Sequence, residues 1–220
     1  MARQGYSDAI DYFSKLEEDT NCPVDLRAQA AFAHGSALMR MDSSDTNYPL
    51  ANFGRAITNE FNQILQLNQT NALVPMANIE IGKCYLQLMN FDAATNSYAQ
   101  VVNATNASVA ARSQALIGIG IVLEKMAALA TGTNQTALFE LALKNYVDVL
   151  HQENLRDGEV ADLFWVKKAG LQAAAAAETL GEWEQAAAIY AELKKWLPQL
   201  SDSLDKKIAG ANAHLSQQKN

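Results

Sequence analysis

The sequence predicts an all-α protein in which antiparallel helix hairpins stack into an α-solenoid of about ten helices. An aromatic residue, an Ala three positions later and a second aromatic four positions after that recur along the chain. Offsets of three and four place these positions on one helical face. The periodic stretches are rich in Ala, Leu, Gln and Glu, and none of the four prolines interrupts one. Recurrence of one helical pattern at long intervals is typical of a helical repeat array.

Four copies of this pattern are strong and one is weak. The strong copies are Tyr6-x-x-Ala9-x-x-x-Phe13, Phe91-x-x-Ala94-x-x-x-Tyr98, Phe139-x-x-Ala142-x-x-x-Tyr146 and Trp183-x-x-Ala186-x-x-x-Tyr190. The weak copy begins at Phe53 and Ala56 and has Glu60 and Phe61 where one aromatic is expected. A small residue between two large ones lets a neighbouring helix approach closely, so each copy is expected to mark a packed helix pair.

The apolar periodicity also places the individual helices. They are predicted at 5–19, 25–41, 49–67, 74–88, 91–104, 108–129, 137–151, 159–179, 183–196 and 201–217. Polar segments at 42–48 and 130–136 separate some of them, with Thr136 as a candidate cap. Pro23 and Pro198 are expected in turns between helices. Pro49 and Pro75 fit the first turn of a helix, where the missing N–H costs little.

The unit from 75 to 108 resembles the tetratricopeptide repeat. It has a small residue, Gly82, on its first helix and another, Ala94, on its second, with large apolar residues around both. The segments 90–94, 5–9 and 181–186 are similar to that family's turn into the second helix. The resemblance covers nearly the whole chain and implies a single superhelical domain over 1–220. Its parts are an incomplete first repeat at 5–19, hairpins at 25–67, 74–104, 108–151 and 159–196, and a capping helix at 201–217.

The repeats are longer than those of a regular array. Successive Ala positions lie farther apart than the ~34 residues of a consensus repeat, largely because of the long loops. Extended repeats of this kind resemble those of bacterial cell-envelope proteins of the TolA-binding type. That resemblance implies a bacterial protein of the periplasm or the cytoplasm, and the sequence leaves both compartments open. No signal peptide is visible, and the chain could be a mature fragment.

Composition narrows the partner classes. The chain has 220 residues, of which 49% are hydrophobic, and a net charge of −7. An acidic chain without clustered Lys or Arg argues against a nucleic-acid partner. No apolar run reaches the ~18 residues of a membrane span, so we expect a soluble protein with no membrane insertion.

The sequence contains no recognisable catalytic or metal-binding motif. His34, His151 and His214 lie far apart, and none has a neighbour at metal-ligand spacing. Cys22 and Cys84 have no Cys or His partner at such a spacing and are expected to be separate thiols. We therefore expect no enzyme, no cofactor and no metal site.

The resemblance implies that the first helices of successive hairpins line a concave groove. Aligning the small residues Gly35, Gly82, Gly118 and Ala174 directs a mixture of apolar and cationic side chains to it. The predicted groove residues are Phe32, Ser36, Met39, Arg40, Met76, Ile79, Lys83, Leu86, Gln87, Arg112, Ile119, Leu123, Lys168 and Leu171. This mixture favours an amphipathic peptide or helix with acidic flanks as the ligand.

Three functions compete at this level. The first is a non-catalytic protein–protein interaction scaffold, which the resemblance favours. The second is a structural subunit of a homo-oligomer or filament, in which the incomplete repeat at 5–19 binds another copy. The third is an enzyme or cofactor carrier on a helical scaffold, which a buried cluster of His, Asp or Glu in one cleft would revive.

Overall fold

The computed structural model describes residues 2–41, 50–67 and 71–218. These residues form helices joined by turns, and none of them lies in a strand, so the all-α prediction is confirmed. The chain divides into two compact units, 1–107 and 108–220. This division falls between two predicted hairpins. The finer prediction of one continuous domain over 1–220 stays a prediction.

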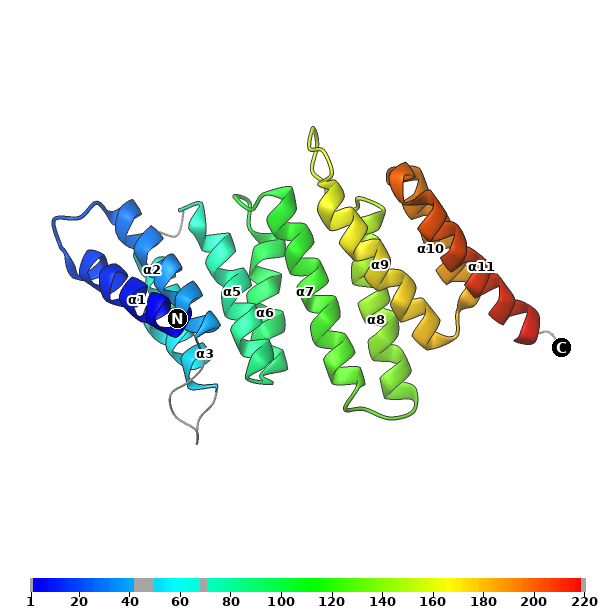
Figure 1. Cartoon of the computed structure of the whole chain (residues 1–220), viewed down its shortest axis with the longest axis horizontal. Coiled ribbons are helices and arrows are strands. Elements are labelled where there is room, and N and C mark those ends of the chain that lie inside the picture. The colour runs from blue at the N-terminus through cyan, green and yellow to red at the C-terminus, as the bar shows by residue number, and fades with distance from the viewer. Residues whose placement is uncertain (1, 42–49, 68–70, 219–220) are drawn as a thin grey trace. The chain divides into compact units, whose positions relative to one another are not determined.

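Unit 1 is a set of antiparallel helices in which each packs on its neighbours along the chain (Figure 1). Its elements are α1 (Ala2–Glu18), α2 (Val24–Arg40), α3 (Ala51–Arg55), the π-helical turn η1 (Ala56–Phe61), α4 (Asn62–Leu67), α5 (Leu73–Gln87) and α6 (Phe91–Asn103). α1 packs on α2, which in turn contacts α3, η1 and α4, and α5 contacts η1, α4 and α6. The main neighbour of α1 is α2, and the apolar residues Tyr6, Ile10, Phe13 and Leu16 of α1 are half-buried.

Unit 2 repeats this organisation. Its elements are α7 (Val109–Ala127), α8 (Thr133–Leu150), α9 (Leu163–Leu180), α10 (Trp183–Trp196), the 3₁₀ turn η2 (Pro198–Leu200) and α11 (Ser201–Gln218). α8 packs against both α7 and α9, and α10 packs against both α9 and α11. Leu204 and Ala211 of α11 are buried while most of its other described side chains are exposed, as expected of a helix that caps a stack.

A small residue of one helix faces a large side chain of the next in each hairpin. Gly82 of α5 lies against Tyr98, and a Cβ built on Gly82 would be 2.7 Å from the ring carbon Cε1. Gly35 has the same relation to Phe61, with a distance of 2.7 Å. The contacts of unit 2 join Gly120 to Tyr146 and Gly170 to Leu193. These glycines permit a close approach that any larger residue would prevent.

These contacts correct part of the sequence alignment. The sequence aligned Gly118 and Ala174 with Gly82, whereas the glycines that meet the large side chains of unit 2 are Gly120 and Gly170. The direction of a side chain on a helix changes by about 100° per residue, so a shift of two or four positions changes which residues face the groove. The groove positions taken from that alignment are shifted in unit 2 for the same reason.

The weak copy of the repeat pattern forms the π-helical turn. Residues 56–61 make one π turn between α3 and α4, and Phe61 packs against Gly35 in the position that Tyr98 takes against Gly82. The pattern therefore contains one extra residue, and the π turn accommodates it, as π turns do elsewhere. As a consequence Glu60, which precedes the aromatic, is buried.

Three helix ends use a left-handed residue to reverse the chain. Gly181 (φ 76°) ends α9, and the N–H of Glu182 donates to the carbonyl of Ala177 (2.9 Å). Met89 (φ 57°) performs the same role after α5, and Gln152 (φ 64°) after α8. A left-handed conformation suits Gly and strains residues that carry a Cβ.

Two helix starts of unit 2, those of α8 and α9, differ most from their predicted positions. α8 begins at Thr133 instead of 137, because Gly132 (φ 61°) turns the chain at once and Gln135 donates to the carbonyl of Ala127 at the end of α7 (3.1 Å). The prediction of a loop over 130–136 with Thr136 as the cap was therefore wrong. α9 begins at Leu163 instead of 159, because the Asp162 side chain accepts the N–H of Phe164 (2.9 Å) and caps the helix.

The proline and cysteine predictions are confirmed where the structure describes them. Pro23 precedes α2, Pro75 lies in the first turn of α5, and Pro198 opens η2. Pro49 and the loop at 42–48 lie outside the described residues. Cys22 and Cys84 are both free thiols.

Replacing Gly82 by Leu is expected to lower the free energy of unfolding of unit 1 by about 1–3 kcal/mol, because the new side chain overlaps the buried Tyr98 ring. The control is Gly54→Ala, since nothing lies within 4 Å of a Cβ at Gly54. That change is expected to leave stability unchanged or raise it by about 0.5–1 kcal/mol. Hydrogen exchange of α5 and α6 amides measures both. Equal effects of the two changes would contradict the packing described for Gly82.

Replacing Met89 by Gly is expected to stabilise the α5–α6 turn by about 1 kcal/mol, because Gly adopts the left-handed conformation without strain. The reciprocal change Gly181→Met is expected to destabilise the α9–α10 turn by a similar amount. Chemical denaturation followed by circular dichroism measures both. A loss of stability in the Met89 variant would contradict this role.

Candidate functional site

An exposed apolar stripe runs along the start of α9. Val160 is 84% exposed, Phe164 is 64% exposed and Leu171 is 39% exposed. Phe164, Lys168 and Leu171 are spaced by four and three residues and share one face of the helix. We call the exposed residues Val160, Leu163, Phe164, Lys167, Lys168 and Leu171 the α9 stripe. Large apolar side chains of this kind are uncommon together on a surface that serves no interaction.

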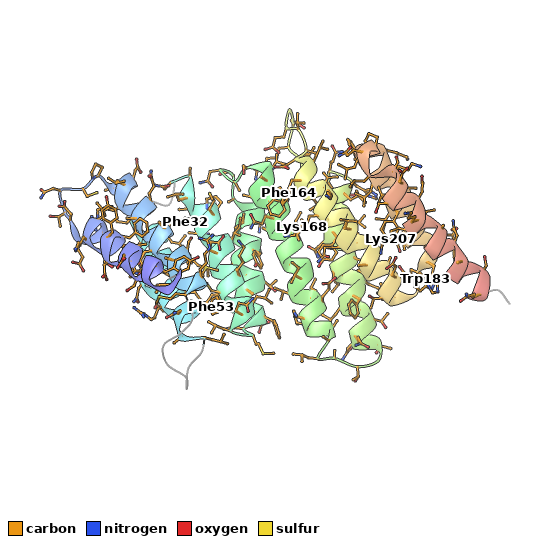
Figure 2. All side chains as sticks on the ribbon, viewed as in Figure 1. Phe32, Phe53, Phe164, Lys168, Trp183 and Lys207 are labelled. Atoms are coloured by element: carbon orange, nitrogen blue, oxygen red, sulfur yellow. The ribbon has the colours of Figure 1, made fainter. Side chains whose placement is uncertain are left out.

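Aromatic contacts hold the centre of the stripe in place. The rings of Phe164 and Trp165 meet edge to face, with centroids 4.9 Å apart. The Lys168 Nζ atom lies over the Trp165 ring, 5.2 Å from its centroid. Phe164 and Lys168 are labelled on α9 in Figure 2. The stripe is therefore an ordered apolar surface that carries two adjacent cations in an otherwise acidic chain.

Arg112 fixes the loop that leads into the stripe. Its side chain is buried, and its guanidinium donates to the carbonyl of Asn154 (3.0 Å) and forms an ion pair with Glu159. Asn154 in turn donates to the Ser113 hydroxyl (2.7 Å). The hydrogen bond from Arg112 lowers the pKa of Glu159 below its ordinary value. The first turn of α7 thereby holds the segment that ends at Val160.

The structure separates the predicted groove residues into three groups. The exposed ones are Arg40, Met76, Gln87, Lys168 and Leu171. The half-buried ones are Phe32, Ser36, Met39, Lys83, Leu86, Ile119 and Leu123. The buried ones are Ile79 and Arg112. Phe32 and Met39 pack partly against the core of unit 1, and Leu123 packs partly against the core of unit 2.

Two of these predictions need correction. Ile79 is 2% exposed and Arg112 is 3% exposed, so neither side chain presents a surface to a partner. The alignment placed both on the groove side, but it could not show that Arg112 has partners in the loop after α8. The predictions for Lys168 and Leu171 differ, because both lie in the α9 stripe.

Sequence reasoning missed Val160, Leu163 and Phe164. The usable signal was the run from Leu163 to Val166, four consecutive large apolar residues at the start of a helix. One buried face cannot accommodate four consecutive positions, so some of them had to be exposed.

A second candidate site is buried in unit 1. The Nδ1 atom of His34, on α2, lies 3.1 Å from Oε1 of Glu17 at the end of α1. The same nitrogen lies 3.2 Å from Oε2 of Glu60 in the π turn. Nearly all of the His34 and Glu60 side chains is buried, and Glu17 is 11% exposed at its side chain. We call these three residues the His34 cluster.

The charges of the His34 cluster act on one another. Burial alone would lower the pKa of His34, but the adjacent carboxylates of Glu17 and Glu60 outweigh burial and raise the pKa to about 9. Burial raises the pKa of Glu17, and the nearby Glu60 carboxylate raises it further. The imidazole of His34 and the carboxyl group of Glu17 therefore hold protons more strongly than they would in water.

The sequence analysis had assigned His34 no ligand role. The three residues come from three elements, so no spacing within one helix announces them. The signal that could have found them is Glu60 itself, a carboxylate at a position where the repeat pattern expects an aromatic.

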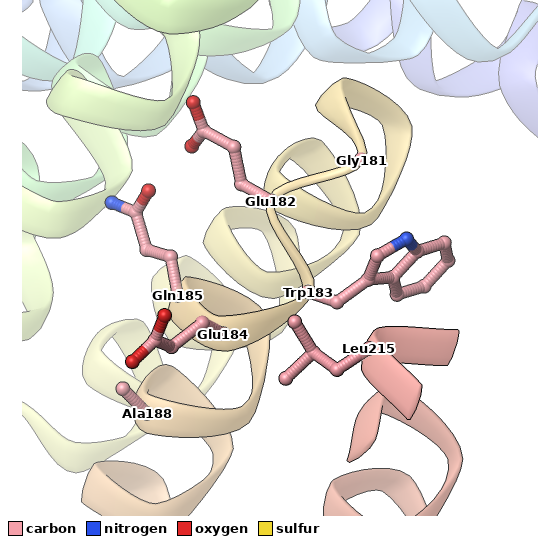
Figure 3. A pocket seen from close by; sticks show the side chains of 7 residues that line it. All are labelled: Gly181, Glu182, Trp183, Glu184, Gln185, Ala188 and Leu215. Carbon is pink, nitrogen blue, oxygen red and sulfur yellow. The ribbon is translucent and has the colours of Figure 1, made fainter. Parts of the chain in front are cut away.

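The remaining histidines make simpler contacts. His151 Nε2 lies 3.0 Å from Glu192 Oε2 in a partly exposed pair. His214 stacks on Trp183 with ring centroids 4.0 Å apart. Figure 3 shows an open hollow that Trp183 helps to line. Trp183 and Leu215 lie close to each other there, and the acidic side chains of the lining are Glu182 and Glu184. The hollow has no buried unpaired polar atom among its described lining residues.

Comparison with known proteins gives no family or relative from which a functional site could be assigned. No protein-family model matches this chain, and no curated protein is similar enough to count as a relative. Among the described residues, no helix is long and apolar enough to cross a membrane. The resemblance to tetratricopeptide repeats remains a prediction from the repeat pattern.

Replacing Arg112 by Met is expected to lower the free energy of unfolding of unit 2 by about 1–3 kcal/mol, the usual cost of leaving a buried acceptor without its donor. The control is Lys144→Met, which breaks an exposed ion pair with Asp148 in the same unit and should change stability by less than about 0.5 kcal/mol. All three tryptophans lie in unit 2, so their fluorescence follows it selectively. If the two variants unfold alike, Arg112 does not fix the loop.

Proposed function

We propose that this protein is a non-catalytic interaction module that holds an amphipathic, acidic segment of another protein against the α9 stripe. The observation that carries the proposal is the exposure of Leu163, Phe164 and Leu171 on α9 together with Val160 in the loop before it. An apolar patch that surrounds an aromatic residue is the usual centre of a protein interface.

The order of the stripe supports this proposal. The stripe lies mainly on a regular helix, and contacts with Trp165 hold Phe164 and Lys168. Arg112 holds the preceding loop through Asn154 and Glu159. A surface that is already ordered loses little conformational entropy when a partner binds.

The charges of the stripe support an acidic partner. Lys167 and Lys168 lie among the apolar residues, whereas the chain as a whole has a net charge of −7. Acidic groups at the ends of an apolar segment would meet these cations and speed its association. A helical or extended peptide fits a helix-lined surface of this kind.

A peptide library displayed against the protein tests the proposal. Selected peptides are expected to combine large apolar residues with Asp or Glu. Phe164→Ser is expected to weaken a selected peptide about 30-fold, the loss of one central aromatic contact of about 2 kcal/mol. Lys168→Glu is expected to weaken it several-fold and to reduce the association rate at low salt.

The control is Leu141→Ser, because Leu141 is a large exposed residue of α8 in the same unit and lies outside the stripe. It should leave peptide affinity unchanged. Peptides that bind all three variants equally would overturn the proposal. Light scattering tests for self-association. If the mass of the wild type rises with concentration while that of Phe164→Ser stays at 23.9 kDa, the stripe binds a second copy of the chain instead of another protein.

A further inference from the structure

We infer that Glu17, His34 and Glu60 form a binding site for a divalent transition-metal cation of the Zn²⁺ class. The inference is independent of the proposed function, because the three residues belong to unit 1 and the α9 stripe belongs to unit 2. Among the described residues, this is the one group of three His, Cys, Asp or Glu side chains whose ligand atoms converge.

The geometry of the cluster suits a shared cation. One nitrogen and two carboxylate oxygens lie within 4.8 Å of one another. Both oxygens approach the same atom, His34 Nδ1, at 3.1 and 3.2 Å. A cation bound by all three atoms would lie between them. Atoms that each lie about 2 Å from one metal ion are necessarily close to one another, as these three atoms are.

Hydrogen bonding among the three residues leaves one oxygen without a donor. Nδ1 carries at most one hydrogen, and its hydrogen-bonded partner is Glu17 Oε1. Glu60 Oε2 is buried, points into the cluster and has no hydrogen-bond donor among the described residues. Glu60 is 4% exposed, so water has little access to this oxygen. A bare carboxylate oxygen in a protein interior is costly, and a cation would satisfy it.

The charge balance leads to the same conclusion. Two carboxylates, a neutral imidazole and a divalent cation together have no net charge, so the bound cation would leave no uncompensated charge in this buried cluster. One imidazole nitrogen with two carboxylate oxygens is a ligand set that Zn²⁺ and similar first-row cations accept.

The site would also join three elements. Glu17 ends α1, His34 lies on α2 and Glu60 lies in η1. None of the described side chains of α1 between 5 and 18 is fully buried, so apolar contacts alone hold this helix weakly. Another polar attachment at this end is Arg27 of α2, whose Nε donates to the Glu17 carbonyl (2.9 Å). Metal binding is therefore expected to protect α1.

Calorimetric titration of the chelator-treated full chain with Zn²⁺ tests the inference. One ion per chain is expected to bind, and hydrogen exchange of the α1 amides is expected to slow when it does. Glu60→Gln keeps the shape of the side chain, removes the unpaired charge and should weaken Zn²⁺ binding at least tenfold. Without metal this variant is expected to be as stable as the wild type or more so, because one buried carboxylate charge is gone.

Glu192→Gln provides the matched control, since it changes the carboxylate of a two-residue His–Glu pair that lacks a third ligand. It should bind Zn²⁺ as the wild type does. Glu17→Gln gives a second variant of the cluster, should Glu60→Gln not fold. The inference is overturned if the wild-type chain shows no saturable binding, or if binding survives unchanged in the folded cluster variants.

Discussion

The spacing of the two helices in each described hairpin depends on a glycine of the first helix that lies against a large side chain of the second. Gly82 with Tyr98 shows the relation most clearly, and Gly35, Gly120 and Gly170 repeat it. Because the large side chain fills the place where a Cβ would stand, the helices approach closely and their register is fixed. The direction of every other side chain on these helices follows from that register. The exposed face of α9 is one consequence.

The hairpin that departs from this relation in sequence keeps it in space. The pattern after Phe53 has one extra residue, and η1 accommodates that residue in a π turn so that Phe61 still reaches Gly35. The extra residue leaves Glu60 buried beside His34. An acidic residue in an apolar interior needs a compensating charge, and Glu17 increases that need instead of meeting it. The irregularity of the repeat therefore coincides with the most unusual chemistry of unit 1.

Periodicity in the sequence was enough to predict the helices, since apolar spacing and prolines are local signals. It failed where contacts join residues that are distant along the chain. Arg112 was assigned to a groove because its helical position suggested it, but the loop at 151–162 returns to bind it. Glu17 and Glu60 share a nitrogen of His34, although each lies on a different element. Phe164 was missed for another reason, because its exposure depends on the exact start of α9, and element ends are the least certain part of a sequence prediction.

A double-mutant cycle between Gly120 and Tyr146 is the most direct measurement of the constraint on which this account depends. Gly120→Leu and Tyr146→Ala would be made singly and together, and tryptophan fluorescence would follow the unfolding of unit 2. We expect each single change to destabilise the unit and the pair to recover at least about 1 kcal/mol relative to the sum, because the new Leu fills the space left by Tyr146. Strictly additive effects would contradict the claim that these two side chains set the spacing of α7 and α8.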